Sequence, residues 1–375
     1  MKTKVVQILI CIFKLILRFI YFFLKFLPVD EKKLIFCSRQ SDRVPLDFIL
    51  IRDMLRKKDS KIKTVCICKH TGNKLTDHLE FMIALLKSMY HMSTSSVCII
   101  DSYWPAVSLL KHKNELTVIQ LWHSIGKVKK SGYQTIGLRS GRKSEYATSL
   151  HMHENYDYVI AGAPVWNKFY CESFNITEDK ILNFGLPRVD YLLETEQGNR
   201  LRFYSQYPEW EDKKVLLYAP TFRRNMKARW QKIIDAVDGK DIVLIIRKHP
   251  GQTMDISKTS TNIFILEEWE TIDLLAVCDY LITDYSAIAI EAAVLNKKTY
   301  YWVYDYDKYI ENNGLNIDLY KQFPGYVYSD IERLLEEILL KESIDDAYAM
   351  YPREYLPNDL GKSTERIVDT IIKSM

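Results

Sequence analysis

The sequence predicts an α/β protein made of two doubly wound domains, each with a parallel β-sheet covered by helices on both faces. Short segments rich in Val, Ile, Leu and Cys alternate with longer helical segments along the chain. The alternation restarts after the polar stretch at residues 194–198, and 375 residues exceed one ordinary domain. Because such domains bind ligands at the carboxyl ends of their strands, we expect the site in a cleft lined by those ends.

The first predicted domain covers residues 29–194. Its strands are expected at residues 33–37, 63–68, 97–100, 117–121 and 157–161, with helices at 46–57, 76–90 and 103–111 and another from 165. The second domain covers residues 195–375, with strands at 215–218, 242–246, 263–266, 279–283 and 299–303. A helix at 287–295 follows the fourth of these strands, and Asp284 and Ser286 are suited to cap it.

Residues 1–28 form a separate segment, which we expect to be an amphipathic helix lying in the membrane interface. One helical stripe contains the polar side chains: Gln7, Lys14, Arg18, Tyr21 and Lys25. The longest charge-free stretch, residues 5–13, is too short to span a bilayer, which needs about 20 residues. A signal peptide is disfavoured because charges break the apolar stretch. We expect the lysines to face an anionic membrane surface, by an interfacial position or by insertion.

The composition is that of an ordinary globular protein, with 47% hydrophobic and 27% charged residues. The formal net charge of +4 is small for this length, so we expect no nucleic-acid partner. The seven cysteines are scattered and show no zinc-ligand spacing. Reduced thiols and a cytoplasmic location follow.

Cations, histidines and hydroxyl side chains follow several predicted strands. They are His123 in the first domain, and Thr221, Arg223, Lys248, His249, Thr283, Asp284 and Ser286 in the second. Cations and helix N-termini together favour a phosphate site, and a histidine beside one is the usual general base.

A basic segment lies between the fourth and fifth predicted strands. It contains Lys127, Lys129, Lys130, Arg139, Arg142 and Lys143. A solvated loop explains these charges equally well. The functional interpretation is a groove for an anionic, lipid-linked acceptor, because the connection at residues 124–155 is long for a compact domain.

These segments together resemble the CDP-glycerol glycerophosphotransferase family of teichoic acid synthesis. The matching segments occur in the family's order, at residues 120–123, 129–130, 185–190, 218–223, 248–250, 283–286, 297–298 and 304–305. The resemblance implies a GT-B type fold of two Rossmann-like domains facing a cleft. It also implies transfer of glycerol phosphate or ribitol phosphate from a CDP-alditol to a hydroxyl of a membrane-bound acceptor, with release of CMP.

The resemblance implies roles for individual residues. His123 and His249 are the catalytic candidates, with His123 as the base for the acceptor hydroxyl and His249 at the donor pyrophosphate. The implied donor-binding residues are Arg188, Thr221, Arg223, Lys248, Thr283, Asp284, Ser286 and Glu291. The basic segment supplies the acceptor-binding residues Lys127, Lys129, Lys130, Arg139 and Arg142. The sequence departs from the family pattern at Ala287, where a second serine is frequent.

The expected co-substrate is CDP-glycerol or CDP-ribitol, and no metal or other cofactor is expected, because side-chain cations and helix dipoles can balance phosphate charge. The expected partners are an anionic membrane surface and a polyprenyl-linked saccharide or teichoic acid acceptor, on the cytoplasmic face of the cell membrane. Two alternatives stay open: a GT-B glycosyltransferase using another nucleotide sugar, and a non-catalytic membrane-bound scaffold. The sequence leaves the donor alditol, the number of units added and the oligomeric state undecided.

Overall fold

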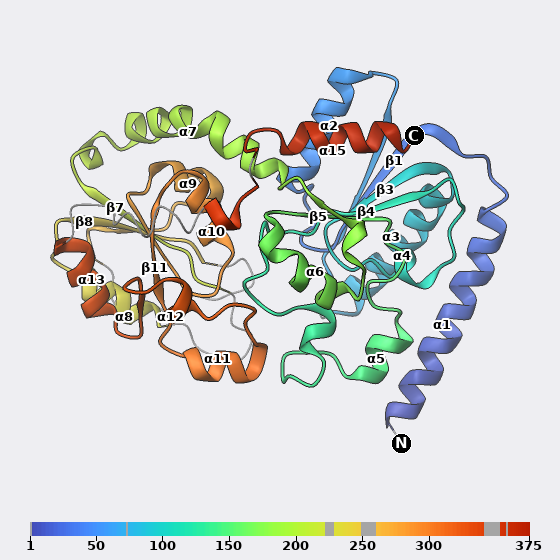
Figure 1. Cartoon of the computed structure of the whole chain (residues 1–375), viewed down its shortest axis with the longest axis horizontal. Coiled ribbons are helices and arrows are strands. Elements are labelled where there is room, and N and C mark those ends of the chain that lie inside the picture. The colour runs from blue at the N-terminus through green and yellow to red at the C-terminus, as the bar shows by residue number, and fades with distance from the viewer. Residues whose placement is uncertain (1, 73, 222–228, 249–259, 341–352, 358) are drawn as a thin grey trace. The chain divides into compact units, whose positions relative to one another are not determined.

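The computed structural model describes residues 2–72, 74–221, 229–248, 260–340, 353–357 and 359–375 (Figure 1). They form two compact units. The first contains Met1–Ile125, Lys130–Arg188 and Lys362–Met375, and the second contains Gly126–Lys129 and Val189–Gly361. Each unit has its own six-stranded parallel sheet, so the predicted α/β class is confirmed.

The sheet of the first unit has the strand order β2-β1-β3-β4-β5-β6. Its strands are β1 (Asp30–Ser38), β2 (Lys63–Cys68), β3 (Ser95–Ile100), β4 (Thr117–Gln120), β5 (Tyr158–Ala161) and β6 (Ile181–Asn183). The apolar parts of the central strands β1 and β3 are fully buried. Continuous rather than alternating burial is what a parallel sheet with two covered faces requires.

The helices of the first unit surround this sheet. They are α1 (Lys2–Leu24), α2 (Leu46–Lys58), α3 (Leu75–Ser93), α4 (Pro105–Leu109), α5 (Ser144–Ser149), α6 (Asn167–Phe174) and α15 (Ser363–Lys373). Short 3-10 turns are η1 (Gly132–Thr135), η2 (Pro164–Trp166) and η3 (Glu178–Lys180). Although α15 is the last helix of the chain, it packs against α2 of the first unit.

The sheet of the second unit has the strand order β12-β11-β10-β7-β8-β9. Its strands are β7 (Lys214–Tyr218), β8 (Ile242–Ile246), β9 (Ile263–Phe264), β10 (Tyr280–Thr283), β11 (Lys298–Trp302) and β12 (Val327–Tyr328). The helices include α7 (Pro187–Gln206), which spans the junction with the first unit, then η4 (Pro208–Trp210), α8 (Trp230–Val237), α9 (Thr271–Val277), α10 (Ile288–Val294), α11 (Tyr306–Asn313), α12 (Leu319–Gln322) and α13 (Ile331–Leu340). This is the strand order of a Rossmann fold.

Each sheet has one point at which the direction of winding reverses. In the first sheet it lies between β1 and β3, and in the second between β7 and β10. At such a point the two following segments leave toward opposite faces, which opens a crevice beyond the carboxyl ends of the strands. These two places are therefore where the fold itself favours ligand binding.

The polar stretch at residues 194–198 is part of a helix and not a linker. It lies in the middle of α7, which continues for 20 residues. Glu, Gln and Thr are compatible with a solvated helix face. Gly198 also faces open space, since no atom lies within 4 Å of the position that a Cβ would occupy. On the inner face, Asn199 is buried and its amide donates to Asp273 of α9 at 3.2 Å. The predicted boundary between residues 194 and 195 therefore falls inside α7, whereas the two units divide at Arg188 and Val189.

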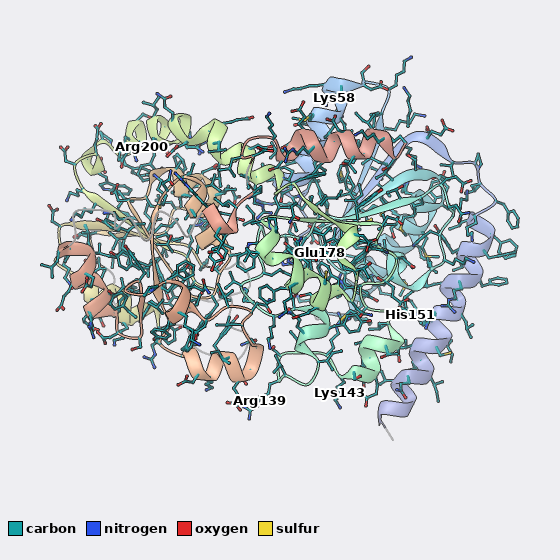
Figure 2. The ribbon with its side chains drawn as sticks, in the orientation of Figure 1. Lys58, Arg139, Lys143, His151, Glu178 and Arg200 are labelled. Carbon is teal, nitrogen blue, oxygen red and sulfur yellow. The ribbon has the colours of Figure 1, made fainter. Side chains whose placement is uncertain are left out.

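Helix α1 packs on the first unit with its polar stripe turned inward. Lys14 Nζ donates to His151 Nε2 at 2.7 Å, and Tyr21 OH contacts His112 Nδ1 at 2.9 Å. Figure 2 labels His151 beside α1. Arg18 donates to the carbonyl of Leu109 at 3.4 Å. Lys14 and Tyr21 therefore bind the loops after α5 and α4, whereas Arg18 is exposed and makes only a long contact with α4. Contact of these cations with lipid headgroups stays a prediction.

The opposite face of α1 is apolar and exposed. The exposed side chains are Val6, Ile8, Leu9, Ile12, Leu15, Ile16, Phe19, Phe22 and Phe23, followed by Phe26 after the helix. The stretch Val6–Leu24 has a mean hydropathy of 2.1 and only 11% of it is buried. By length and composition alone it is long and apolar enough to cross a membrane, which is weak evidence by itself.

A bidentate ion pair joins the start of α7 to the start of α2. Arg188 Nε donates to Asp47 Oδ2 at 2.9 Å, its Nη2 contacts the same oxygen, and its backbone N–H donates to Oδ1 at 2.9 Å. The Asp47 side chain is almost completely buried, whereas Arg188 is one-fifth exposed. A buried carboxylate needs such partners because desolvation of an unpaired charge is costly.

We predict that Asp47→Ala lowers the free energy of unfolding of the first unit by about 3 kcal/mol, because it leaves the Arg188 guanidinium without its buried partner. The matched control is Asp53→Ala in the same helix, whose side chain is half exposed in its contact with Arg52. The control should change the stability by less than about 0.5 kcal/mol. Urea unfolding followed by tryptophan fluorescence measures both, and equal effects would contradict the assigned role.

Candidate active site

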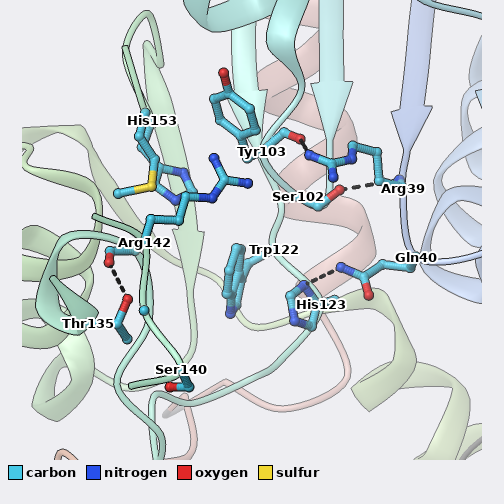
Figure 3. A pocket seen from close by; sticks show the side chains of 13 residues that line it. Arg39, Gln40, Ser102, Tyr103, Trp122, His123, Thr135, Ser140, Arg142 and His153 are labelled. Carbon is cyan, nitrogen blue, oxygen red and sulfur yellow. Dashed lines mark hydrogen bonds between the residues drawn. The ribbon is translucent and has the colours of Figure 1, made fainter. Parts of the chain in front are cut away.

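A cavity of about 310 Å³ lies in the first unit beyond the carboxyl ends of β1, β3 and β4 (Figure 3). Two lining residues lie within three positions of the end of each of these strands. The lining residues are Arg39, Gln40, Ser102, Tyr103, Trp122, His123, Gly132, Thr135, Ser140, Gly141, Arg142, Met152 and His153. The cavity thus occupies the reversal point between β1 and β3.

Asp101 lies beneath this cavity and ties the two strands at the reversal point together. Ser38 at the end of β1 donates its hydroxyl to Asp101 Oδ2 at 2.6 Å, and Ser102 donates to Oδ1 at 2.9 Å. Asp101 is 3% exposed. Burial raises the pKa of its carboxyl to about 6, and the two hydroxyl donors oppose that rise.

The backbone carbonyl of Asp101 favours one tautomer of His123, with the proton on Nδ1. The His123 Nδ1 lies 3.0 Å from the carbonyl oxygen of Asp101. A carbonyl only accepts, so Nδ1 carries the proton and the lone pair is on Nε2. Gln40 Nε2 also lies 3.0 Å from Nδ1. An amide nitrogen only donates, so with Nδ1 protonated this contact is favourable only after the amide is turned to present its oxygen. His123 is half-buried, and in its neutral form this tautomer leaves the Nε2 lone pair available for general-base catalysis.

Trp122 holds the His123 ring from the other side. The two ring centroids are 4.1 Å apart, and the Trp122 ring meets Phe174 edge-on at 5.1 Å. The backbone of Trp122 has a φ of 61°, which is unfavourable for a bulky residue, and Gln120 Oε1 accepts its N–H at 2.9 Å. Strain of this kind persists where the surrounding contacts position a side chain for function.

Two arginines occupy the same cavity. Arg39 is held by its guanidinium donating to the carbonyl of Tyr103 at 3.1 Å and to Thr71 Oγ1 at 3.3 Å. Arg142 lies over the Tyr103 ring, with its Cζ 5.2 Å from the centroid. Burial, and then the charge of Arg142, lower the pKa of Arg39. The cavity therefore combines a base with positive potential.

In the second unit, the predicted donor residues gather at the other reversal point. Asp284 Oδ1 accepts the backbone N–H of Thr221 at 2.8 Å and that of Tyr285 at 2.6 Å. Thr283 donates its hydroxyl to the carbonyl of Ala219 at 2.7 Å. These bonds join the segments that follow β7 and β10. The sequence thus predicted correctly that Thr221, Thr283 and Asp284 lie together at strand ends.

The helix after β10 differs from the expectation in its capping. The side chain of Asp284 binds two loop amides, and Ser286 Oγ lies a long 3.4 Å from the amide of Ile288. The N-cap residue of α10 is Ala287, with no side-chain capping bond. Asp284 therefore stabilises the loop and does not cap the helix. Glu291, in the first turn of α10, is 7% exposed.

The remaining predicted residues are dispersed. Lys248 follows β8, is exposed and lies 3.8 Å from Glu267. Arg223 and His249 lie outside the described residues. Arg188 binds Asp47, as described above. Of the acceptor candidates, only Arg142 lines the cavity; Lys130 and Arg139 are exposed elsewhere on the first unit.

Lys127 and Lys129 belong to the second unit and not to an exposed basic surface. Asn316 Nδ2 donates to the carbonyls of Lys127 and Lys129 at 2.7 and 3.2 Å, and Lys129 forms an antiparallel bridge with Leu315. The Lys127 side chain is 2% exposed, and burial lowers its pKa well below the ordinary value. The idea of one continuous basic groove is therefore corrected.

The sequence interpretation missed Arg39, Gln40, Tyr103 and His153. Arg39 and Gln40 directly follow β1, and Ser102 and Tyr103 follow β3. The rule that ligands bind at strand ends was applied to the fourth strand and to the second domain only. Applied to every strand, it finds the first three residues, whereas His153 lies in a long connection with no periodic signal.

We predict that Asp101→Asn removes a pH dependence of stability. The folded carboxyl has a raised pKa of about 6, so the native state binds more protons than the unfolded state above the ordinary value of 3.8. Stability therefore falls as pH rises from about 4 to about 6, by at most about 3 kcal/mol. Urea midpoints at several pH values should show this slope in the wild type and a flatter one in the variant. Parallel curves would contradict it.

Comparisons with known proteins identify the family of the chain. The family model described as CDP-Glycerol:Poly(glycerophosphate) glycerophosphotransferase matches residues 19–373. A teichoic acid ribitol-phosphate primase of Bacillus spizizenii is 29% identical over 359 residues, which is 92% of each chain. A teichoic acid glycerol-phosphate primase of Bacillus subtilis is 31% identical over 265 residues, 68% of each chain.

Solved structures share the fold. The wall teichoic acid polymerase TagF, at 20% identity, gives a TM-score of 0.73 over 92% of this chain and 89% of that one. A UDP-GlcNAc 2-epimerase of Methanocaldococcus jannaschii, at 16% identity, gives 0.55 over 91% and 99%. The second likeness shows that the fold alone does not decide the chemistry. The family match across the chain does decide membership: this protein is an enzyme of the CDP-glycerol glycerophosphotransferase family.

Proposed function

We propose that this enzyme transfers glycerol phosphate or ribitol phosphate from a CDP-alditol to a hydroxyl of a membrane lipid-linked acceptor, releasing CMP, in teichoic acid or related cell-wall polymer synthesis. The observation that carries the proposal is His123, whose Nδ1–H is bound to the Asp101 carbonyl inside a positively charged cavity. The relatives named above act with glycerol phosphate or ribitol phosphate, so both donors remain candidates.

The reaction needs one proton transfer and one displacement. The lone pair of His123 Nε2 takes the proton of the acceptor hydroxyl, and the oxygen attacks the phosphorus that bears the alditol. The bond from that phosphorus to the bridging oxygen breaks, and CMP leaves with the electron pair. The imidazolium then returns its proton to solvent. The Asp101 carbonyl stabilises this cation because it accepts from Nδ1–H in both protonation states.

The donor phosphates belong, in this proposal, to the loops after β7, β8 and β10. Backbone amides and the hydroxyls of Thr221 and Ser286 lie there, with Lys248 after the neighbouring strand. Glu291 is proposed for the ribose, and Arg223 and His249 for the pyrophosphate. We propose that these groups balance the phosphate charge without a metal ion.

The central experiment measures CMP release from CDP-glycerol and CDP-ribitol with a lipid-linked acceptor. His123→Ala should lower kcat by about 10²–10⁴-fold, because it removes the base. His78→Ala, an exposed histidine of α3, is the matched control and should retain wild-type turnover. Release should persist in excess chelator. Unchanged turnover in His123→Ala, or turnover of UDP-sugars in place of both CDP-alditols, would refute the proposal.

We also propose that α1 seats the enzyme peripherally on the cytoplasmic face of the cell membrane. Its exposed apolar face supports an interfacial position, and its polar stripe fixes that face outward by binding the first unit. Lys14 and Arg18 of the helix, and Lys25 directly after it, hydrogen-bond to the protein. Apolar burial, rather than attraction to anionic headgroups, therefore dominates the contribution of α1.

This orientation predicts that vesicle binding through α1 resists salt. At about 1 M salt the screening length is about 3 Å, so attraction to anionic lipids is largely lost while apolar burial persists. Co-sedimentation with neutral and anionic vesicles should therefore change little between low and high salt. The change Phe19→Ser with Phe22→Ser should weaken binding, whereas Lys168→Ser, an exposed position on α6, should not. Release of the wild type by salt would contradict the orientation.

A further inference from the structure

We infer that Arg39 and Arg142 form a phosphodiester subsite, which binds the acceptor through the phosphate that precedes its terminal alditol. The inference rests on the proposed function and goes beyond it, because it assigns the acceptor's charged group to two residues. Such a subsite would make the enzyme selective for acceptors that already carry a phosphate next to the alditol that bears the reacting hydroxyl.

The first argument is charge without compensation. Arg39 and Arg142 both lie against the ring of Tyr103, with Cζ to centroid distances of 5.9 and 5.2 Å. Figure 3 shows both side chains extending into the space beside that ring. Within the described part of the chain, neither forms an ion pair with a carboxylate. Two guanidinium groups that repel each other in a small cavity are complementary to an anion, and phosphate oxygens fit their planar donors.

The second argument is that the arrangement is built into the fold. Tyr103 donates its hydroxyl to the carbonyl of Leu150 at 2.8 Å, and its ring packs with Ala147 and Met152. The loop before Arg142 turns tightly, since a Cβ at Gly141 would lie 1.7 Å from the carbonyl oxygen of Thr135. The Tyr103 ring and the turn at Gly141 are therefore fixed by packing, and Arg142 is an exposed side chain that lies over this ring.

The third argument is location. The same cavity contains His123, the proposed base for the acceptor hydroxyl, and its volume of about 310 Å³ is at the small end of ligand pockets. An anion bound by the arginines is thus held beside the base. The donor phosphate under attack also approaches this base, so the test below measures KM for donor and acceptor separately. Hydroxyl groups of Thr135 and Ser140 at the cavity wall are suited to the polyol between phosphate and reacting oxygen.

The test compares two synthetic acceptors with the same terminal alditol and the same alkyl chain. One carries a phosphodiester before the alditol, and the other carries a neutral ether. For Arg142→Gln, KM for the charged acceptor should rise about tenfold or more, because a charge-assisted contact is lost. KM for the neutral acceptor and KM for the donor should change less than KM for the charged acceptor, because neither contact involves the lost charge. Lys168→Gln, an exposed charge change on α6, is the control.

Arg39→Lys is a second variant, which keeps the positive charge but loses the planar guanidinium with its paired N–H donors. KM for the charged acceptor should rise less in this variant than in Arg142→Gln. A binding measurement then separates this inference from the proposed function. Titration of the wild type with bis(glycero)phosphate, without donor, should give heat that Arg142→Gln lacks. Equal KM changes for both acceptors, or a rise confined to the donor, would overturn the subsite. Absence of CMP release by the wild type would instead refute the transfer reaction, leaving the titration to decide the subsite.

Discussion

The hydrogen bonds around Asp101 are the interaction on which the candidate site depends. The carboxylate accepts from Ser38 and Ser102 and so holds the ends of β1 and β3 at the point where the sheet reverses its winding. The carbonyl of the same residue accepts from His123. Asp101 therefore links the geometry of the sheet to the tautomer and orientation of the His123 ring. A shift of either strand end would be transmitted to the imidazole through bonds of 3.0 Å or less.

Much of the fold was predictable because its strands are apolar and short. The strands at residues 63–68 and 242–246 agree with β2 and β8, and the other predicted strands differ by a few residues at their ends. The strands β6 and β12 were missed: they have three and two residues, and neither lies in an apolar run like the one that revealed the two-residue β9. Segments that short carry no periodicity, and their pairing is set by the neighbouring strand rather than by their own sequence.

Site residues were predictable where a reactive side chain directly follows a strand. They were not predictable where the role of a side chain depends on whether it points into the protein or toward solvent. His123 and Arg142 were named from sequence and line one cavity. Lys127 was named on charge alone, yet its side chain is buried. The polar stripe of α1 was recognised, but the contacts of Lys14 and Tyr21 with the first unit were not foreseen. A helical wheel reports that two faces differ, and only the tertiary structure reports which of them meets protein.

The path of the chain has a consequence for how the protein is made. The second unit is inserted between Arg188 and Lys362 of the first, and the first unit is completed by α15. Buried Ile367, Val368 and Ile371 pack this helix against the first unit, and Asp369 pairs with Lys58 of α2 at 2.5 Å. During synthesis from the N-terminus, the surface of α2 that receives α15 stays uncovered while the whole second unit is translated. Translation of the unit that contains His123 thus begins before that of the second unit and ends after it.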